Sequence, residues 1–216
     1  MVRVHRTPTS PASLEREKAK NRGSYREQDV LAQLRADFHD KCYLCEMDEL
    51  QSVEVEHLQP HRGDKDLKFA WKNLFLSCAH CNSVKNQRKY DNTILDCCLV
   101  DPEALLQQAL ENGTVVVRPL TQDETVQKTA ELIEECFEKT NTGIRTMECE
   151  TRKKALKQTM GLLYQALGKY RKNPDGEALQ VLRGMLNRKY KFSAFTRTYV
   201  RSHLSDYPGL AGEVML

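Results

Sequence analysis

Two pairs of cysteines are the residues in this chain best suited to chemistry. Each pair has the form Cys-x-x-Cys, and the four residues are Cys42, Cys45, Cys78 and Cys81. A two-residue gap allows one tight turn to present both sulfur atoms of a pair. Four thiolates suit zinc, because this borderline-soft ion takes four ligands tetrahedrally at about 2.3 Å from sulfur and has no geometric preference from its d electrons. The spacing therefore predicts one structural zinc ion held by these four side chains.

Polar side chains suited to acid–base and metal chemistry lie between and beside the two pairs. Glu56 and His57 lie between the pairs, Asn73 precedes the second pair, and Asn82 follows its last cysteine. Carboxylate and amide oxygens are ligands for hard ions such as Mg²⁺. Histidine has an ordinary pKa of about 6.5, so that much of it is neutral and able to accept a proton near pH 7.

Short strands and helices are expected to position these residues. Alternating apolar residues over 53–57 predict a strand, which Pro60 ends, and residues 73–77 predict a second strand. A polar loop is expected over 59–72. Residues 79–88 predict a helix that starts inside the second cysteine pair, and residues 24–38 predict a helix that leads to the first pair.

Beyond residue 95 the pattern is mainly helical. We predict helices over 102–111, from the capping motif Thr121-x-x-Glu124 onward, and over 151–170, with helical residues resuming up to about 201. A β-branched run at 114–118 interrupts them. The expected fold class is α+β, with an arm, helix and core over 1–95 and a helical docking region for a partner or DNA over 96–216.

Charge is distributed unevenly, although the net charge of the 216 residues is only +3. Residues 96–150 carry 4 Lys/Arg against 12 Asp/Glu, whereas residues 152–201 carry 13 against 2. Such a basic block can attract nucleic acid without regard to base sequence. The alternative is a solvated helical face that answers the acidic segment of the same protein, and the sequence favours neither interpretation.

No feature of the sequence points to export. No apolar stretch approaches the roughly 20 residues of a membrane span, and residues 1–13 lack the apolar core of a secretory signal, so we expect a cytoplasmic protein. Cys136 lies on a helical apolar face and is expected to be a buried, inert thiol. His80 is expected at the surface. The aromatic stripe Phe192, Phe195 and Tyr199 is expected in the core rather than as a base-stacking platform.

These motifs together resemble the HNH endonuclease motif in its zinc-binding form. The resemblance covers roughly residues 40–90, and it rests on Cys42-x-x-Cys45, Glu56-His57, Asn73-Leu74 and Cys78-x-x-Cys81-Asn82-x-x-Lys85. Three further segments are similar to the HNH component of bacterial Septu-type antiphage systems: Arg3-Val4-His5-Arg6-x-Pro8, Ile94-Leu95-Asp96 and Phe192-Ser193-Ala194-Phe195. In those systems the nuclease acts with an ABC/SMC-like ATPase.

The resemblance implies a ββα-metal nuclease core that hydrolyses DNA. His57 would be the base that takes a proton from water as it attacks the phosphorus. Asn73 would orient that base or bridge the loop between the strands. Glu56 and Asn82 would hold a catalytic Mg²⁺ or Mn²⁺ ion. Two basic residues on the following helix, Lys85 and Arg88, would reach the DNA backbone.

Two departures from the commonest HNH pattern and two rival functions complete the expectations. Glu56 stands where Asp or His is more usual, and Asn82 stands where many members have His, so we expect millimolar-range metal dependence. Neighbours on a strand face opposite sides, so Glu56 and His57 converge on one phosphate only if the strand twists or ends there.

One rival function is a zinc-stabilised module that binds nucleic acid or protein without cleaving it. The other is cleavage of RNA.

Overall fold

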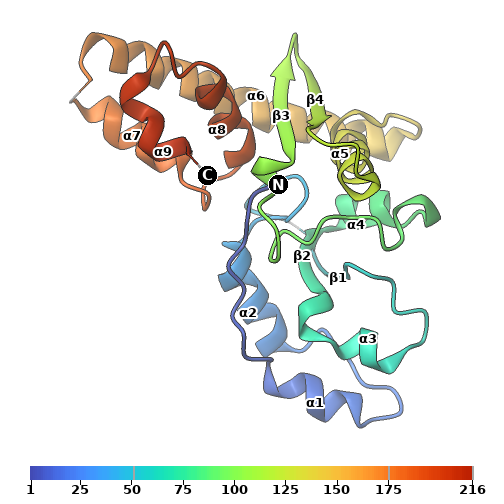
Figure 1. The fold of residues 1–216 in the computed structure, drawn as a ribbon. Coiled ribbons are helices and arrows are strands. Elements are labelled where there is room, and N and C mark those ends of the chain that lie inside the picture. Colours follow the sequence, from blue (N-terminus) through green and yellow to red (C-terminus); the bar gives the residue numbers. More distant parts are fainter. Residues whose placement is uncertain (51, 175, 216) are drawn as a thin grey trace.

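A two-stranded antiparallel sheet lies at the centre of the N-terminal half in the computed structural model, which describes residues 1–50, 52–174 and 176–215 (Figure 1). Strand β1 (Val53–His57) pairs with β2 (Leu74–Cys78), with Val53 opposite Cys78 and His57 opposite Leu74. Helix α4 (Ala79–Lys85) follows β2 directly and contacts both strands. Both predicted strands and the predicted helix are therefore present in the expected order.

Helix α2 (Gln28–Phe38) covers β2 because its apolar stripe faces the sheet. Its side chains Val30, Leu34 and Phe38 are buried, and the Phe38 ring meets the Phe75 ring edge-on at 5.6 Å between centroids. Every residue of β2 is buried, as expected for a strand covered on both faces. The helix starts four residues later than the sequence predicts.

Three short elements near the sheet are not predicted by the sequence. They are α1 (Ala12–Lys18), α3 (Lys65–Phe69) and the 3₁₀ turn η1 (Trp71–Asn73), and α1 contacts α3. Helix α3 lies inside the stretch expected as a polar loop, and η1 overlaps its end. Elements of three to seven residues are too short to show a helical period, although the Asp64 side chain caps α3 by accepting from two backbone N–H groups.

The helix predicted over 102–111 is wrong. Only η3 (Pro102–Ala104) is helical, and β3 (Leu106–Glu111) then pairs with β4 (Thr114–Pro119) as a hairpin. The two linking residues, Asn112 and Gly113, have φ of 50° and 83°. An Asn-Gly pair in the left-handed region is the preferred two-residue hairpin turn, and this local signal outweighs the weak helical period before it.

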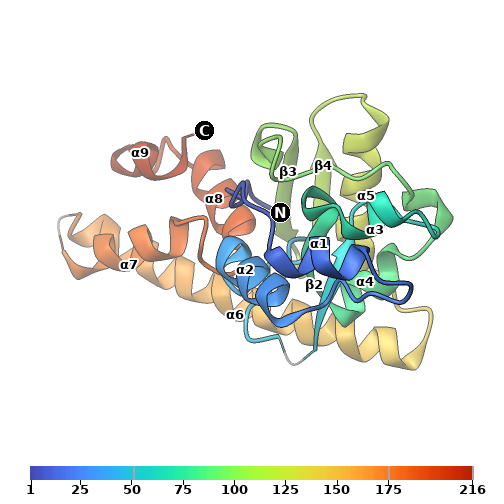
Figure 2. The same ribbon diagram turned by 90° about the horizontal axis from the view of Figure 1, so that it is seen from below.

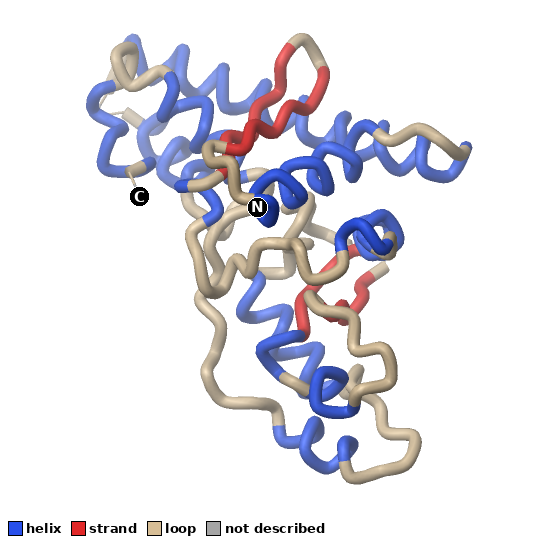
Figure 3. The backbone as a smooth tube through the Cα atoms, turned by 45° about the vertical axis from the view of Figure 1, so that its right-hand side comes forward, coloured by secondary structure: helices blue, strands red, loops and turns tan. Residues whose placement is uncertain are grey.

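Helices make up most of the remaining chain (Figure 3). After the hairpin they are α5 (Glu124–Glu138), α6 (Gly143–Lys172), α7 (Glu177–Leu186), α8 (Ser193–Ser202), the 3₁₀ turn η4 (Pro208–Leu210) and α9 (Ala211–Val214). A further 3₁₀ turn, η2 (Arg88–Tyr90), lies before the hairpin. Helix α5 buries an apolar stripe that includes Val126, Ala130, Ile133 and Phe137, and Asp123 rather than Thr121 caps it. In Figure 2, α6 runs along the lower edge of the view, from the side of α7 to the side of α4 and α5. Among the described residues, no helix has the length and apolar character needed to cross a membrane.

The regions on either side of residue 95 share contacts and one continuous buried cluster. Lys89 of η2 contacts the carboxylates of Glu131 and Glu135 on α5, each at 2.6 Å. Buried Glu46 accepts from Ser193 and from the backbone of Ala194 at the start of α8. The division into regions 1–95 and 96–216 stays a prediction. Side chains of the two regions contact each other across this boundary.

The Glu135 carboxylate should make the junction between η2 and α5 sensitive to acid. Burial opposes ionisation, but hydrogen bonds from Lys89, Lys139 and Gln87 lower the pKa of Glu135 to about 2. Its contribution is therefore present above the unfolded pKa of about 4.3 and is lost as pH falls towards 2. We expect Glu135→Gln to lower the free energy of unfolding by about 1 kcal/mol at pH 7. Denaturant titration at pH 7 and pH 2.5 checks this.

The same substitution at exposed Glu124, in the first turn of α5, is the control. A difference between Glu135→Gln and the wild type that stays constant down to pH 2.5 contradicts the assignment.

Candidate metal centre and hydrolytic site

The four cysteines of the two pairs meet at one buried point. Their sulfur atoms all lie within 4.8 Å of one another. A tetrahedral ion with bonds of about 2.3 Å places its sulfur ligands about 3.8 Å apart, so the cluster fits zinc in size and donor type. Cys42 and Cys45 lie in the turn after α2, Cys78 ends β2, and Cys81 lies in the first turn of α4. The four predicted ligands are therefore confirmed as residues positioned to hold a metal.

A buried arginine from α6 contacts this cluster. The Arg152 guanidinium donates to Cys78 Sγ at 3.1 Å and to the Glu148 carboxylate at 2.6 Å, and the residue is 4 % exposed. Hydrogen bonds from the other three thiols, together with the charge of Arg152, lower the pKa of the Cys78 thiol. Four thiolates around Zn²⁺ carry a net negative charge, which a buried cation offsets. No local sequence signal identifies Arg152, because it lies 74 residues from Cys78.

Two expectations about neighbouring residues have opposite outcomes. Cys136 is buried, as predicted, and burial raises the pKa of its thiol. The expected surface position of His80 is wrong, because its ring is buried beside α5 with Nε2 3.0 Å from the Cys136 carbonyl oxygen. The carbonyl oxygen satisfies a ring nitrogen that would otherwise be buried without a partner.

His57 is held in one tautomer by a backbone carbonyl. Its Nε2 lies 2.9 Å from the Lys68 carbonyl oxygen. A carbonyl can only accept, so Nε2 carries the proton and Nδ1 keeps the lone pair. Burial, together with the nearby charges of His61, Lys85 and Arg26, lowers the pKa of His57 to about 4 despite this hydrogen bond. The imidazole is thus neutral at pH 7, with an unprotonated Nδ1 that can accept a proton.

Glu56 is buried on β1 with one oxygen occupied and one without a partner. Its Oε1 lies 2.7 Å from Lys85 Nζ and accepts from the Tyr43 hydroxyl at 3.2 Å. Among the described residues, Oε2 is buried with no hydrogen-bond partner. Burial raises the pKa of Glu56 even beside Lys85. A cation bound at Oε2 would satisfy the orphaned oxygen and favour the ionised carboxylate, so the residue fits a divalent ion.

Lys85 belongs to the site rather than to the surface. It is 6 % exposed, and its ammonium also donates to the His57 carbonyl oxygen at 3.0 Å. The predicted contact of Lys85 with a DNA backbone does not fit this burial, because leaving the pair would strand the Glu56 carboxylate. Asn82 is half-buried on α4, three residues before Lys85 and so on the same side of the helix.

Asn73 bridges the loop between the two strands. Its Oδ1 accepts from Gln59 N at 2.8 Å, and its Nδ2 donates to the carbonyl oxygens of Gln59 and Leu67 at 2.9 and 3.1 Å. Of the two roles expected for Asn73, these contacts match the bridging role. They hold the backbone next to Lys68, whose carbonyl oxygen orients His57.

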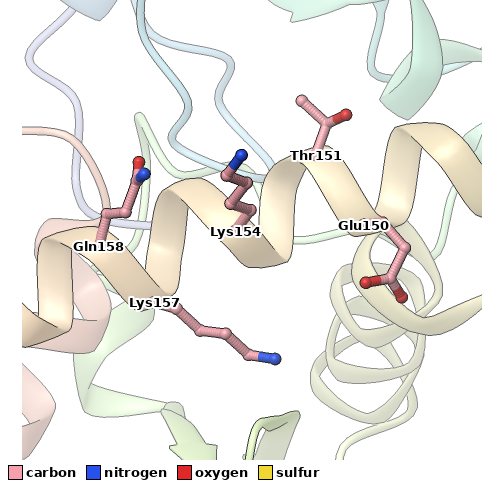
Figure 4. Close-up of a pocket in the computed structure, with 5 residues that line it drawn as sticks. All are labelled: Glu150, Thr151, Lys154, Lys157 and Gln158. Carbon is pink, nitrogen blue, oxygen red and sulfur yellow. The ribbon is translucent and has the colours of Figure 1, made fainter.

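Most of the basic block pairs within the protein. Three of its arginines, Arg188, Arg197 and Arg201, contact the Glu103 carboxylate, which is 1 % exposed. This favours the interpretation that the block answers the acidic segment. Lys154 and Lys157 are exposed, lie one turn apart on α6 and line the same pocket (Figure 4). Arg88 is also exposed, so it remains the predicted DNA contact that a backbone could reach.

Comparison with known families matches the part of the chain that builds this site. Residues 42–88 match the family model of HNH endonucleases. This HNH segment contains the four cysteines, His57 and its neighbours from β1 to α4, and it ends at Arg88. Helix α1 and everything from β3 onward lie outside it. No curated protein matches the chain.

Arg152 should slow the release of a bound metal ion, although it is not a ligand, because it donates to a ligand sulfur atom. We expect Arg152→Met to release zinc to a colorimetric chelator about tenfold faster than the wild type, the lower end of the range for outer-shell partners. Lys154→Met, which removes an exposed cation from the same helix, is the control. Equal release rates for the two variants would show that Arg152 only packs against α4 and β2.

The bridging role of Asn73 should make this residue important for the stability of the fold, in contrast to Asn82. We expect Asn73→Ala to lower the free energy of unfolding by about 2 kcal/mol, because two backbone carbonyls and one N–H lose a buried partner. Asn82→Ala should leave stability unchanged within about 0.5 kcal/mol. Urea titration of both variants measures this. A stable Asn73→Ala protein contradicts the bridging role.

Proposed function

We propose that this chain is a metal-dependent endonuclease that hydrolyses DNA phosphodiester bonds. The observation that carries the proposal is the neutral His57, whose Nε2 is fixed by the Lys68 carbonyl oxygen and whose Nδ1 carries no proton and can accept one. It lies in a segment that matches HNH endonucleases. The adjacent residue, Glu56, keeps a buried oxygen without a partner.

His57 Nδ1 accepts a proton from the water that attacks the phosphorus. The new bond joins the water oxygen to phosphorus, the bond to the leaving oxygen breaks, and solvent protonates that oxygen. The imidazolium keeps its Nε2–H bond to the Lys68 carbonyl oxygen, which stabilises the positive charge. Glu56 and Asn82 are proposed to hold a Mg²⁺ or Mn²⁺ ion, which would supply positive charge for the oxygens of the transition state. Lys85 keeps Glu56 in place.

The four-cysteine cluster is proposed to hold a structural zinc ion, and β1, β2 and α4 to form a ββα-metal core. The cluster joins the turn before β1 to the end of β2 and the start of α4. Zinc at this point would fix both strands relative to the helix that carries Asn82 and Lys85. The geometry of the hydrolytic site would then depend on an ion that takes no part in the reaction.

We further propose a cytoplasmic role in antiphage defence together with an ABC/SMC-like ATPase. The similarity of residues 3–8, 94–96 and 192–195 to Septu-type components supports this. Helices α6 and α7 also expose apolar side chains that a partner could cover, Leu162 and Val181, each 53 % exposed. Co-purification of an ATPase encoded beside this gene, lost in a Leu162→Glu/Val181→Glu double variant, tests it. Substitution is preferable to deleting residues 152–216, because deletion would also remove Arg152.

Plasmid cleavage tests the proposed activity. With Mg²⁺ or Mn²⁺ we expect the wild type to cut supercoiled plasmid, alone or with the ATPase, and His57→Ala to be slower by at least about 100-fold. Parallel reactions with single-stranded RNA decide between the two substrates. Zinc content and DNA binding are measured on the same preparations.

Wild-type protein that binds DNA and keeps its zinc, yet never cuts with or without the ATPase, supports the alternative of a non-cleaving binding module. Cutting by His57→Ala at the wild-type rate would remove His57 from the reaction.

A further inference from the structure

A turn from outside the HNH segment lies against the proposed base. This turn, residues 20–26, joins α1 to α2 and is called here the α1–α2 turn. The Tyr25 ring meets the His57 imidazole edge-on, with 4.5 Å between centroids and an interplanar angle of 69°. On another side, the His61 ring lies 4.8 Å from the same imidazole. The imidazole is therefore in contact with two rings, whose own centroids are 6.4 Å apart, and is hydrogen-bonded at Nε2.

The α1–α2 turn has a fixed backbone. A Cβ atom on Gly23 would lie 1.8 Å from the Glu17 carbonyl oxygen, so the chain passes too close to α1 for any side chain. The Glu17 carboxylate accepts from the Ser24 backbone N–H at 3.2 Å. Glycine and this hydrogen bond hold the turn against the end of α1, and Tyr25 follows directly.

Side chains tie the turn to both elements that carry the His57 environment. Lys68 Nζ donates to the Gly23 carbonyl oxygen at 2.8 Å, while the Lys68 carbonyl oxygen accepts from His57 Nε2. Arg26 forms an ion pair at 3.1 Å with Glu54, three residues before His57 on β1. Lys68 thus both fixes the tautomer of His57 and anchors the turn that packs on the His57 ring.

We propose that the α1–α2 turn is a positioning element for the general base, with Tyr25 as its positioning residue. The role deepens the proposed function and rests on it. An imidazole held by one hydrogen bond still turns about χ2, whose energy wells are broad. Packing by Tyr25 removes that freedom and keeps Nε2 on the Lys68 carbonyl oxygen, so that Nδ1 faces the substrate. Tyr25 itself touches neither substrate nor metal.

The test uses the full chain with Tyr25→Ala, Tyr25→Phe and Lys68→Met. The first removes the ring, and the second keeps its edge. The third removes the ammonium contact to Gly23 but keeps the backbone carbonyl that binds His57. Tyr164→Ala, at a 42 % exposed tyrosine on α6, is the matched control. Thermal unfolding shows which variants are folded.

The first readout needs no cleavage. Long-range ¹H–¹⁵N spectra of the His57 imidazole at pH 7 report which nitrogen carries the proton. We expect the Nε2-protonated form in the wild type, in Tyr25→Phe and in Tyr164→Ala, and a mixture of tautomers in Tyr25→Ala and Lys68→Met. An unchanged tautomer in folded Tyr25→Ala and Lys68→Met overturns the proposal, whether or not the wild type cuts DNA.

The second readout is the kinetics of plasmid cleavage. Tyr25→Ala is expected to lower kcat about tenfold with KM unchanged, and Tyr25→Phe to restore most of the wild-type rate. A raised KM with unchanged kcat would overturn the proposal, because the turn would then bind substrate instead of orienting the base. If Tyr25→Ala is unfolded, Lys68→Met carries both readouts. Absence of cutting by the wild type counts against the proposed function alone, and the spectra then decide the role of Tyr25.

Discussion

The convergence of four buried thiols is the constraint on which the rest of the structure depends. The sheet has only two strands, and an isolated two-stranded hairpin is at best marginally stable in water. The cluster joins the turn after α2, the end of β2 and the first turn of α4, so that one point fixes three elements. Buried thiolates repel one another unless a cation lies among them, and a bound metal ion together with Arg152 would supply that positive charge. The cluster would thus reinforce the packing of α4 against β1, across which Glu56 contacts Lys85.

Two polar contacts carry this constraint to the proposed reaction. The Lys85 ammonium lies between the Glu56 carboxylate and the His57 carbonyl oxygen, which joins α4 to the end of β1. Asn73 holds the intervening loop so that the Lys68 carbonyl oxygen reaches His57. A buried ion pair contributes little net stability, but breaking one leaves an uncompensated charge. The polar network therefore sets the position of the site more than it stabilises the fold.

The sequence predicts the parts of this site whose chemistry is local. Cysteine spacing identifies the metal cluster, and short apolar runs identify β1 and β2. What it misses depends on distant segments. Arg152 and Tyr25 reach the site from helices and turns far along the chain, and nothing in their own neighbourhood marks them. Lys85 looks like a surface residue on a basic helix, and only the fold reveals that the helix turns it towards Glu56. The helix predicted over 102–111 is replaced by β3, because Asn112-Gly113 forms a hairpin turn that pairs this segment with the predicted β-branched run at 114–118.

Anomalous diffraction from crystals of the full chain soaked in Mn²⁺ tests the central claim most directly, because it locates both metals independently of activity. The account predicts a zinc peak among the sulfur atoms of the four cysteines and a separate manganese peak beside Glu56 Oε2 and the Asn82 side chain. A zinc peak with no manganese near Glu56, or no metal among the four sulfur atoms, would contradict it.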